Sequence, residues 1–508
     1  MPPAEIRPLA RPVRLQDVAR LVDSDYVGDV VVTGVTLDSR GVRPGDLYAA
    51  LPGHVTHGGR FVSAALTAGA GAVLTDPAGA AALGPLAVPV LVHPEPRARL
   101  GDVAAFVYGN PATELLILGI TGTNGKTTVA AMVESGLRAA GRVTGMIGTV
   151  GVTIAGESHP GVRTTPEAPD LQALLAVMRE RSVEAVVMEV SSIALAEHRV
   201  DGLAYDVAAF TNLSQDHLDY HGTMEAYYTA KAELFTPAHS RSAVVGIDDE
   251  WGRRLVIDSR VPTRTWSLSD ASATWQGERA GAVVVMSGPE EGPVPMRVPM
   301  PGAFNAANAL CAYAVLRQAR VAPDAAVAGI ESARVPGRMQ TIASEHGVTG
   351  VVDYAHSPDA IERVLIAARE TSSGRLIAVL GAGGDRDRGK RAVMGHTAVR
   401  LADVVIVTDD NPRSEDPATI RAAIMDGTQG VDVADERSGR AVVVEEADRR
   451  AAITVAVGMA EAGDMVLVLG KGHEQGQDIG GVVTPFDDLT VLAEALGVGR
   501  ASEAGGSA

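Results

Sequence analysis

The fold of this chain is decided by the segment Ile117-Leu-Gly-Ile-Thr-Gly-Thr-Asn-Gly-Lys-Thr-Thr128. Its apolar start predicts a strand, its glycines predict a turn, and the residues that follow predict a helix. A turn of this kind directs backbone N–H groups and the N-terminus of a helix toward a polyphosphate. Lys126 is then expected to reach the β- and γ-phosphates, and Thr127 to bind Mg²⁺. The strict pattern has glycine at position 120, where Ile120 stands, and Gly122 supplies the flexibility further along the turn.

Short apolar runs rich in β-branched residues alternate with Ala-rich helical stretches along most of the chain. Clear runs lie at residues 30–35, 115–120, 185–190, 376–380, 404–407 and 465–469. Most of them are followed at once by Gly, Asp or Ser. Continuous apolar strands that end in such residues indicate a buried parallel sheet with sites at the carboxyl ends of the strands. The sequence therefore predicts an α/β protein.

Two turn-rich breaks divide the chain into three predicted domains. The length of 508 residues is more than one hydrophobic core normally supports. The breaks lie near Tyr108-Gly-Asn-Pro111 and near Val335-Pro-Gly-Arg338. Residues 267–301 have few helix formers and predict an antiparallel patch. The predicted units are residues 1–112, 113–336 and 337–496, with a disordered tail at 497–508.

Composition and charge exclude several classes of protein. The net charge of -18 argues against nucleic-acid binding through the overall field, so anionic substrates need local positive sites. The single cysteine, Cys311, excludes an intrachain disulfide framework and a cysteine-based zinc site, and we expect it to be buried on a helix. The N-terminus has no apolar signal region, and no apolar stretch approaches the ~20 residues of a membrane span. The sequence predicts a cytoplasmic protein.

Candidate metal ligands follow the strand at 185–190. Glu189 lies at the end of this apolar run, where a buried carboxylate is costly without a cation. His217 and His221 have the spacing of a helical zinc pair, but the glutamate of an HExxH motif is absent. Lys231 falls in a helical stretch, and its chemistry alone indicates only a solvated charge.

The turn Thr121-Gly-Thr-Asn-Gly-Lys-Thr127 resembles that of the Mur ligases and of the related folylpolyglutamate synthetases. These enzymes activate a carboxylate as an acyl phosphate and then capture it with an amine. Further segments follow in the order of the Mur ligase family, namely Pro301-Gly-Ala-Phe-Asn-Ala-Ala-Asn308, Val335-Pro-Gly-Arg-Met-Gln340 and Val351-Val-Asp-Tyr-Ala-His-Ser-Pro-Asp359. The resemblance implies a central P-loop ATPase-type parallel sheet. An N-terminal uridine-nucleotide-binding domain and a C-terminal Rossmann-like domain would flank it.

The resemblance also implies the parts of an ATP site. Lys126, His217, Lys231 and Arg338 correspond to catalytic positions. Two Mg²⁺ ions would be held by Thr127, Glu189, His217 and a carbamate formed on Lys231 by carbon dioxide (N6-carboxylysine). The implied ATP contacts are Gly122, Thr123, Asn124, Gly125, Lys126, Thr127, Thr128, Asn308, Arg338 and Asp353.

The segment Asp409-Asp-Asn-Pro-Arg413 resembles that of the family members that add meso-diaminopimelate to a UDP-N-acetylmuramoyl dipeptide. The members that add lysine lack this arginine. Diaminopimelate has a second carboxylate, which a guanidinium binds with two parallel charge-assisted hydrogen bonds. In isolation the same segment could be a loop whose arginine faces water. The implied contacts of diaminopimelate are Arg386, Asp410, Asn411, Pro412, Arg413, Gly470 and Glu474.

The N-terminal part resembles the family's uridine-binding loops at residues 35–40 and 52–58. Two positions depart from the family pattern. Ile193 stands where histidine is usual, and Glu197 stands where some members have glutamine, which puts its sugar or peptide contact in doubt. The implied contacts of the UDP-N-acetylmuramoyl dipeptide are Leu37, Ser39, His54, Val55, Thr56, Thr164, Thr165, Ser191, Glu197 and Arg199.

The resemblance therefore predicts an ATP-dependent ligase, expected to act as a monomer, that joins meso-diaminopimelate to UDP-N-acetylmuramoyl-L-Ala-D-Glu. Three alternatives stay open on the sequence. They are a lysine-adding ligase of the same family, a folylpolyglutamate-type ligase, and a nucleotide-binding scaffold without catalysis. Arg413 argues against the first, the uridine-like loops against the second, and the intact Lys126 and Lys231 against the third.

Overall fold

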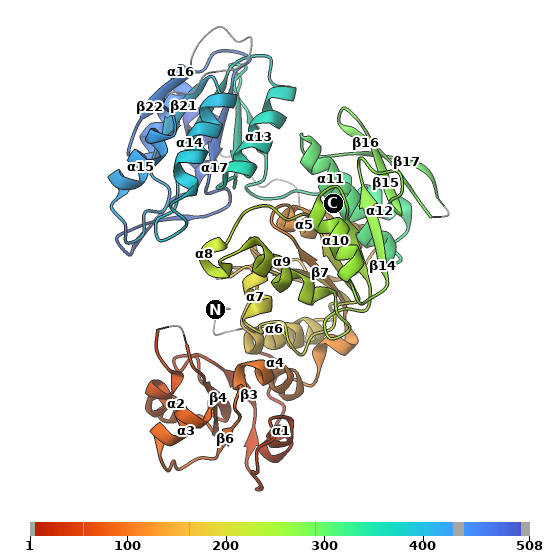
Figure 1. The fold of residues 1–508 in the computed structure, drawn as a ribbon, viewed down its shortest axis with the longest axis vertical. Helices are drawn as coiled ribbons and strands as arrows, with labels where there is room; N and C mark the ends of the chain where they lie inside the picture. Colours follow the sequence, from red (N-terminus) through yellow and green to blue (C-terminus); the bar gives the residue numbers. More distant parts are fainter. Residues whose placement is uncertain (1–5, 54, 162, 290, 430–440, 499–508) are drawn as a thin grey trace.

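The computed structural model describes residues 6–53, 55–161, 163–289, 291–429 and 441–498. The chain forms three lobes, with the middle lobe between the N-terminal and C-terminal lobes (Figure 1). Each lobe is built on its own β-sheet. The α/β, three-domain architecture predicted from the sequence is confirmed, whereas the predicted domain limits stay predictions. The last ten residues of the predicted tail, 499–508, lie outside the described residues.

The N-terminal lobe contains a parallel sheet of four strands in the order β3-β4-β5-β6. A small antiparallel pair, β1 and β2, lies beside it. The single strand predicted at residues 30–35 is wrong, because the chain changes partner at Thr33, whose N–H donates to Gly45 O. The bounds are β1 Val13–Arg14, β2 Val31–Val32, β3 Gly34–Thr36, β4 Asp46–Ala50, β5 Ala72–Thr75, β6 Val90–Val92, α1 Leu15–Leu21, η1 Gly58–Phe61, α2 Val62–Thr67, α3 Pro77–Leu83 and α4 Pro96–Val107.

The middle lobe contains a mixed sheet of eleven strands in the order β10-β9-β8-β11-β7-β12-β13-β14-β15-β16-β17. Its centre, from β8 to β15, is parallel. The antiparallel patch predicted at residues 267–301 is present as β15, β16 and β17, and the hairpin β9–β10 was not predicted. The strands are β7 Leu116–Thr121, β8 Thr144–Gly148, β9 Gly151–Ile154, β10 Glu157–His159, β11 Ala185–Glu189, β12 Val207–Phe210, β13 Ala243–Gly246, β14 Thr263–Ser267, β15 Trp275–Ala280, β16 Val283–Gly288 and β17 Glu291–Arg297.

Helices cover both faces of this sheet because its strands are apolar on both sides. Along β7, Leu118 and Ile120 join one core with α5 and α11, whereas Ile117 joins a second core with α6 and α9. Cys311 is buried in α11, as predicted. The helical elements are η2 Pro111–Glu114, α5 Lys126–Ala139, α6 Ala168–Glu180, α7 Ser192–Ala196, α8 Leu218–His221, α9 Met224–Ala232, η3 Glu233–Phe235, α10 Glu250–Asp258, α11 Ala303–Gln318 and α12 Pro323–Ser332.

The C-terminal lobe contains a sheet of six strands in the order β18-β19-β23-β20-β21-β22, parallel except for β18. The runs at 376–380, 404–407 and 465–469 coincide with β20, β21 and β23. None of the described helices in any lobe combines the length and the apolar character that crossing a membrane requires. The elements are β18 Gln340–Ala343, β19 Thr349–Asp353, α13 Pro358–Thr371, β20 Leu376–Leu380, α14 Lys390–Leu401, β21 Val404–Val407, α15 Pro417–Asp426, β22 Val442–Glu445, α16 Arg449–Met459, β23 Met465–Leu469, β24 Gly476–Ile479, β25 Val482–Pro485 and α17 Asp488–Ala495.

Candidate active site

The predicted phosphate turn joins β7 to α5 in the middle lobe. Gly122 and Gly125 have φ angles of 143° and 87°, a region that glycine adopts without strain. A Cβ atom at Gly122 would lie 1.9 Å from Thr211 Oγ1, and one at Gly125 would lie 2.2 Å from Asn308 Oδ1. Both glycines are therefore needed for the conformation of the turn and for its close packing.

Two lysines meet at one backbone carbonyl of this turn. Lys126 Nζ donates to Gly122 O at 3.0 Å, and Lys231 Nζ donates to the same oxygen at 2.9 Å. Lys231 is only 2% exposed, so it is not the solvated helix lysine that its sequence context alone indicated. Burial, together with the positive charge of Lys126, holds the pKa of Lys231 well below its usual value. Lys231 therefore loses its proton more easily than an exposed lysine does.

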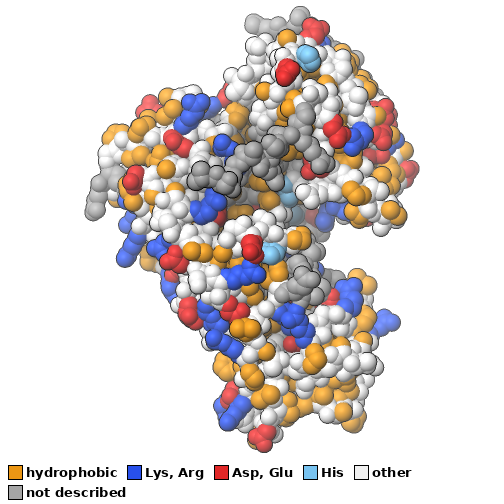
Figure 2. All heavy atoms as spheres, turned by 180° about the vertical axis from the view of Figure 1, so that it is seen from behind, with side chains coloured by type: hydrophobic (Ala, Val, Ile, Leu, Met, Phe, Trp, Pro, Cys, Tyr) orange, Lys and Arg blue, Asp and Glu red, His pale blue; other side chains and the backbone are white. Residues whose placement is uncertain are grey.

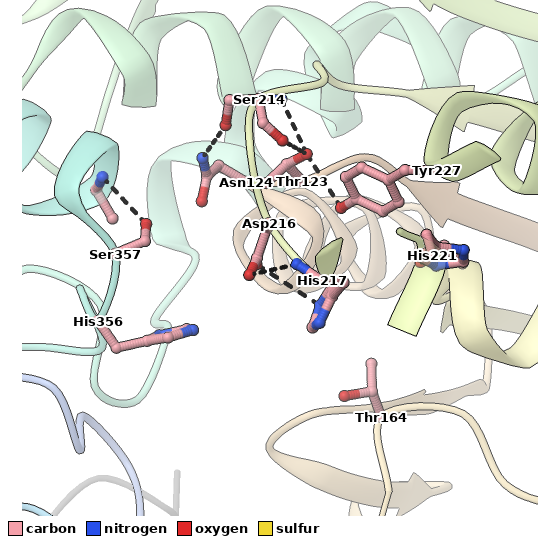
Figure 3. A network of polar contacts seen from close by, with 12 residues as sticks. Thr123, Asn124, Thr164, Ser214, Asp216, His217, His221, Tyr227, His356 and Ser357 are labelled. Atoms are coloured by element: carbon pink, nitrogen blue, oxygen red, sulfur yellow. Dashed lines mark hydrogen bonds and ion pairs between the residues drawn. The ribbon is translucent and has the colours of Figure 1, made fainter. Parts of the chain in front are cut away.

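Tyr227 joins Lys231 to the turn and to His217. Its hydroxyl lies 3.1 Å from Thr123 Oγ1, and the Lys231 Nζ lies 4.7 Å from its ring centroid. The His217 ring packs edge-on against the same ring at 6.1 Å (Figure 3). The structure thus brings together Thr123, His217 and Lys231, which are far apart in the sequence.

Glu189 ends β11 beside the first helical turn of α5. It is 1% exposed, and its Oε2 accepts hydrogen bonds from Thr127 Oγ1 and Thr149 Oγ1, both at 3.0 Å. Its Oε1 accepts the Thr149 N–H at 2.8 Å. Thr127 and Glu189 therefore present adjacent oxygens, which fit a Mg²⁺ ion.

A metal at this place would need further ligands. Among the residues that the structure describes, no three His, Cys, Asp or Glu side chains lie close enough together to hold a metal ion by themselves. Substrate phosphate oxygens commonly complete such a site. A carbamate on Lys231 would add two oxygens beside Lys126, and it would replace a pair of like charges with a pair of opposite charges. The residues present fit both Mg²⁺ and the carbamate.

A cavity of about 290 Å³ opens beside the phosphate turn, between the middle and C-terminal lobes. Arg338 lines it, donates to Thr127 Oγ1 at 3.2 Å and stacks over the Tyr354 ring at 4.6 Å. Asp353 is buried and accepts the N–H groups of Met339 and Ala355, and burial raises its pKa. Asn308 also lines the cavity from inside α11. The cavity therefore contains the three predicted nucleotide clamps, namely Asn308, Arg338 and Asp353.

Hydrogen bonds cross between the middle and C-terminal lobes at this cavity. Asn124 Nδ2 donates to Asp359 Oδ2 at 2.8 Å, and His473 Nε2 lies 3.1 Å from Thr149 O. Figure 3 shows His356 of the C-terminal lobe pointing toward Asp216 and His217 of the middle lobe. Seen from behind, the side of the molecule between the C-terminal and N-terminal lobes is deeply hollowed (Figure 2). The phosphate turn thus faces groups from the middle lobe and from the C-terminal lobe.

The segment after β21 forms a polar cluster with the segment after β23. Asn411 Nδ2 donates to Glu474 Oε2 at 2.7 Å, and Lys471 Nζ donates to Asn411 Oδ1 at 3.1 Å. Gly470 has a φ of 114°, and a Cβ there would lie 2.6 Å from Asp410 Oδ2. Asp410 Oδ1 is buried without a hydrogen-bond partner among the described residues, although Lys471 Nζ lies 3.7 Å away. A ligand ammonium would satisfy such an oxygen.

Arg413 and Arg386 both approach the Cβ position of Gly383. A Cβ at Gly383 would be 3.1 Å from Arg413 Nη1 and 3.8 Å from Arg386 Cγ. Arg413 has a φ of 51°, and its loop is tied to the β24–β25 hairpin by the hydrogen bond from Arg413 N to Asp478 O. Its Nη1 donates to Gly384 O at 2.6 Å. The structure brings all seven predicted diaminopimelate residues to one end of the C-terminal sheet, with Arg386 the most exposed of the charged ones.

A cavity of about 1010 Å³ lies between the N-terminal and middle lobes. Leu37, Ser39 and Thr56 line it from the N-terminal side. Val55 is 98% exposed, and His54 lies outside the described residues. The size and position of the cavity fit the acceptor nucleotide predicted from the sequence.

The remaining predicted acceptor contacts belong to the middle lobe. Thr165 Oγ1 donates to Glu189 O at 2.9 Å and accepts the Ser191 N–H, while Thr164 Oγ1 lies 3.1 Å from Thr149 Oγ1. These hydroxyls therefore surround the Glu189 end of β11. Arg199 pairs with Glu167 at 3.0 Å, and Glu197 accepts from Tyr220 at 2.7 Å. Glu197, which stands where some family members have glutamine, therefore has a hydrogen-bond partner within the chain.

Three family models match this chain in succession. They are described as the Mur ligase family catalytic domain (residues 31–108), the Mur ligase middle domain (residues 120–316) and the Mur ligase glutamate ligase domain (residues 337–472). A relative from Streptomyces coelicolor, UDP-N-acetylmuramoyl-L-alanyl-D-glutamate--2,6-diaminopimelate ligase, is 50% identical over 96% of this chain and 98% of its own. The chain belongs to the Mur ligase family.

Two further comparisons bear on its place among the Mur ligases. A protein of the same description from Streptomyces avermitilis is 51% identical over 92% of this chain and 93% of its own. A solved structure of a UDP-N-acetylmuramoyl-L-alanyl-D-glutamate--2,6-diaminopimelate ligase matches with a TM-score of 0.68 and 34% identity. It covers 96% of this chain and 99% of that chain.

Several residues of this Mur ligase site were missed in the sequence. Tyr227 could have been found, because it lies one helical turn before Lys231 and shares its face of α9. Lys471 and His473 stand between two predicted contacts, Gly470 and Glu474. Asp359 and Thr149 carry no local signal, since their partners come from other lobes or strands.

Proposed function

We propose that this chain is an ATP-dependent ligase that joins meso-2,6-diaminopimelate to UDP-N-acetylmuramoyl-L-Ala-D-Glu in the synthesis of peptidoglycan precursors. The observation that carries the proposal is the position of Arg413 beside Arg386, in a chain about half identical to diaminopimelate ligases over nearly its whole length. The cytoplasmic location and the monomeric state predicted from the sequence stay predictions.

The reaction has two steps. A carboxylate oxygen of the dipeptide's D-Glu attacks the γ-phosphorus of ATP, and ADP leaves. The amine of diaminopimelate then attacks the acyl carbon, inorganic phosphate leaves, and the amine gives up a proton as the amide forms. The large cavity between the N-terminal and middle lobes would hold the UDP-sugar, and the cavity beside the phosphate turn would hold ATP.

Lys126 and Arg338 are the side chains best placed to stabilise the transferring phosphoryl group. Both lie at the phosphate turn, where Arg338 contacts Thr127 and Lys126 contacts Thr123 O at 2.8 Å. Donors already held in place stabilise developing charge without reorganisation. Bound Mg²⁺ would supply further positive charge at the phosphate oxygens. Thr127 and Glu189 would hold one ion, and His217 with the Lys231 carbamate would hold the second.

Arg413 provides the basis for selecting diaminopimelate over lysine. Only one of its guanidinium nitrogens donates a hydrogen bond within the part of the chain that the structure describes, so its other donors can bind a carboxylate. Lysine has no second carboxylate to offer. Arg413 is half-buried in the free protein. If bound lysine buried it without a partner, the cost would be about 2–5 kcal/mol.

One observation argues against each of the three alternative functions. A lysine-adding ligase has no use for Arg413 beside Arg386. A folylpolyglutamate-type ligase does not need the N-terminal lobe, and a solved folylpolyglutamate synthase covers only 74% of this chain. A non-catalytic scaffold has no use for two lysines on one carbonyl.

The test is ATP-dependent phosphate release with UDP-N-acetylmuramoyl-L-Ala-D-Glu and either meso-diaminopimelate, L-lysine or no amino acid. We expect efficient release with meso-diaminopimelate, a much lower kcat/KM with L-lysine, and no release without an amino acid. Arg413→Ala should lower kcat/KM for meso-diaminopimelate by roughly 30-fold or more, the lower end of that energy range. Arg400→Ala, on the surface of α14, is the matched control and should behave like the wild type. Equal release with lysine would reject the selectivity, and no release with any amine would favour the scaffold.

A further inference from the structure

Lys471 lies behind the proposed diaminopimelate pocket. Its side chain is 0% exposed, so it is less accessible to a substrate than the residues that it contacts. Its Nζ lies 3.1 Å from Asn411 Oδ1, 3.3 Å from Glu474 Oε2 and 3.7 Å from Asp410 Oδ1. All three partners are residues that the sequence assigned to diaminopimelate. The ammonium therefore contacts three pocket residues from two separate segments.

Lysine is rare in this chain. Only four of its 44 lysines and arginines are lysines, namely Lys126, Lys231, Lys390 and Lys471. Lys126 and Lys231 lie at the phosphate turn. A chain that uses arginine for nearly all of its positive charge has a compact, three-donor ammonium at position 471. The donors of a guanidinium are fixed in one plane, so an arginine at this position could not direct three donors to three separate acceptors around a single buried nitrogen.

The contacts of Lys471 fix the orientation of the Asn411 amide. Asn411 Oδ1 accepts from Lys471 and also from the Asp478 N–H at 3.0 Å. The nitrogen must therefore lie on the opposite side, where it donates one hydrogen to Glu474. An amide nitrogen has two hydrogens, so the second one can be donated to a substrate carboxylate.

The same contacts decide which oxygen of Glu474 is available. Its Oε2 accepts from both Asn411 and Lys471. Its Oε1 has no hydrogen-bond partner among the residues described, and a carboxylate oxygen accepts readily from an ammonium. Lys471 thus leaves one donor on Asn411 and one acceptor on Glu474 for the substrate.

Lys471 also sets the charge balance of the pocket. Asp410 and Glu474 are acidic, and Arg413 is the basic residue proposed to bind the distal carboxylate. Arg386 is a second basic residue among the predicted contacts. The loss of Lys471 would therefore change the balance from three basic and two acidic groups to two of each, which would weaken the binding of a dicarboxylate. The same change would penalise lysine less, because lysine carries one negative charge fewer.

We propose that Lys471 is a positioning residue that sets the selectivity of the amino-acid pocket for a substrate with two carboxylates. It acts through Asn411 and Glu474 rather than by contact with the substrate. This inference rests on the proposed function, since it concerns the amino-acid pocket of the same reaction.

The test compares Lys471→Met, which keeps the length of the side chain but removes its charge, with the wild type in the phosphate-release assay. We expect the KM for meso-diaminopimelate to rise at least tenfold, while the KM values for ATP and for the UDP-sugar stay within twofold. The ratio of kcat/KM for meso-diaminopimelate to that for L-lysine should fall at least tenfold. Arg450→Met, an exposed residue of α16 in the same lobe, is the control and should change none of these values.

Lys471→Gln is the second variant, because it keeps a donor for Asn411 without the charge. We expect its KM for meso-diaminopimelate to lie between those of the wild type and Lys471→Met. An unchanged selectivity ratio in a folded variant would overturn the proposal, as would an equal loss with both amino acids. Failure of both variants to fold would make Lys471 a folding element and would also overturn it. If the wild type itself does not use meso-diaminopimelate, the proposed function fails, and that result is seen before any variant is measured.

Discussion

Lys231 is the residue whose surroundings differ most from what its sequence context suggests. It shares the carbonyl of Gly122 with Lys126, and Lys231 is buried whereas Lys126 is half-buried. Two like charges in such a place are unfavourable, so the neutral amine is the favoured form of Lys231. A neutral amine is the form that reacts with carbon dioxide. This geometry supports the carbamate on physical grounds that are independent of the family resemblance.

We predict that Lys231→Met folds but loses at least about 100-fold in kcat, the usual effect of losing one fixed group that stabilises charge. The lowered pKa of Lys231 also predicts how the free energy of unfolding changes with pH. Between the lowered folded pKa and the unfolded value near 10.4, the unfolded chain binds more protons, so wild-type stability rises with pH. In carbon-dioxide-free buffer, thermal melts should show that the wild type gains stability from pH 7 to pH 9 relative to Lys231→Met. A parallel pH dependence of the two proteins would contradict the burial of a titrating amine.

At this scale the sequence predicted residues that act through a local motif. Lys126 and Thr127 were recognisable because the strand, turn and helix that position them are continuous in the chain. Lys471 was not, because its partner Asn411 is 60 positions away and only the fold brings them together. Arg413 was recognisable as a candidate, but its approach to Arg386 across Gly383 depends on tertiary packing.

At the scale of elements, the N-terminus of α13 is tied to the phosphate turn. Asp359 in the first turn of α13 accepts from Asn124 Nδ2 at 2.8 Å, and Ser214 Oγ lies 3.3 Å from the same oxygen. Arg363 donates to the other oxygen at 3.0 Å. A carboxylate at the start of a helix is favoured by the helix dipole, so Asp359 suits this position in both respects.

We predict that Asp359→Ala raises the KM for ATP by about two- to fivefold. The effect is small because the carboxylate is one-third exposed, and bonds of such groups contribute about 0.2–1 kcal/mol. The KM for the UDP-sugar should stay unchanged, since that cavity lies at the other end of the middle lobe. Glu362→Ala, a neighbouring acidic residue of α13 that faces Arg400, is the control. Equal changes in both variants would show that surface charge, rather than the contact with Asn124, is responsible.

The elements that the sequence predicted best are fully buried parallel strands. Residues 376–380, 404–407 and 465–469 are apolar throughout and form β20, β21 and β23 with those limits. The run at 30–35 is interrupted by Thr33 and Gly34, and the chain divides it between β2 and β3, which belong to different sheets. Periodicity describes burial along a strand and does not say with which sheet the strand pairs.

At the scale of the whole molecule, two glycines bring the backbones of the N-terminal and middle lobes into close contact. Gly101 of α4 packs against Asp201 so closely that a Cβ would lie 2.0 Å from the Asp201 carbonyl oxygen. Gly202, with a φ of 74°, approaches the Gly101 backbone in turn. The acceptor cavity is lined from the same two lobes, although neither glycine lines it. We therefore expect this backbone contact to influence the width of the cavity. No sequence pattern indicated it, since a glycine inside a helix predicts only lower stability.

We predict that Gly101→Ala forces the two lobes apart, because the obstructing atom belongs to backbone and cannot rotate away. Overpacking of this kind costs typically about 1–3 kcal/mol. The KM for UDP-N-acetylmuramoyl-L-Ala-D-Glu should rise at least tenfold, whereas ATP binding, measured by calorimetry, should be unchanged because its cavity lies between the middle and C-terminal lobes. Gly458→Ala is the matched control, a helical glycine of α16 with open space around its Cβ position, and it should leave both values as they are. The proposed ATP cavity lies at the junction of the other two lobes, so a loss of ATP affinity in Gly101→Ala would show that the three lobes respond as one rigid unit. An unchanged KM for the UDP-sugar would show that the packing of α4 does not set the width of the acceptor cavity.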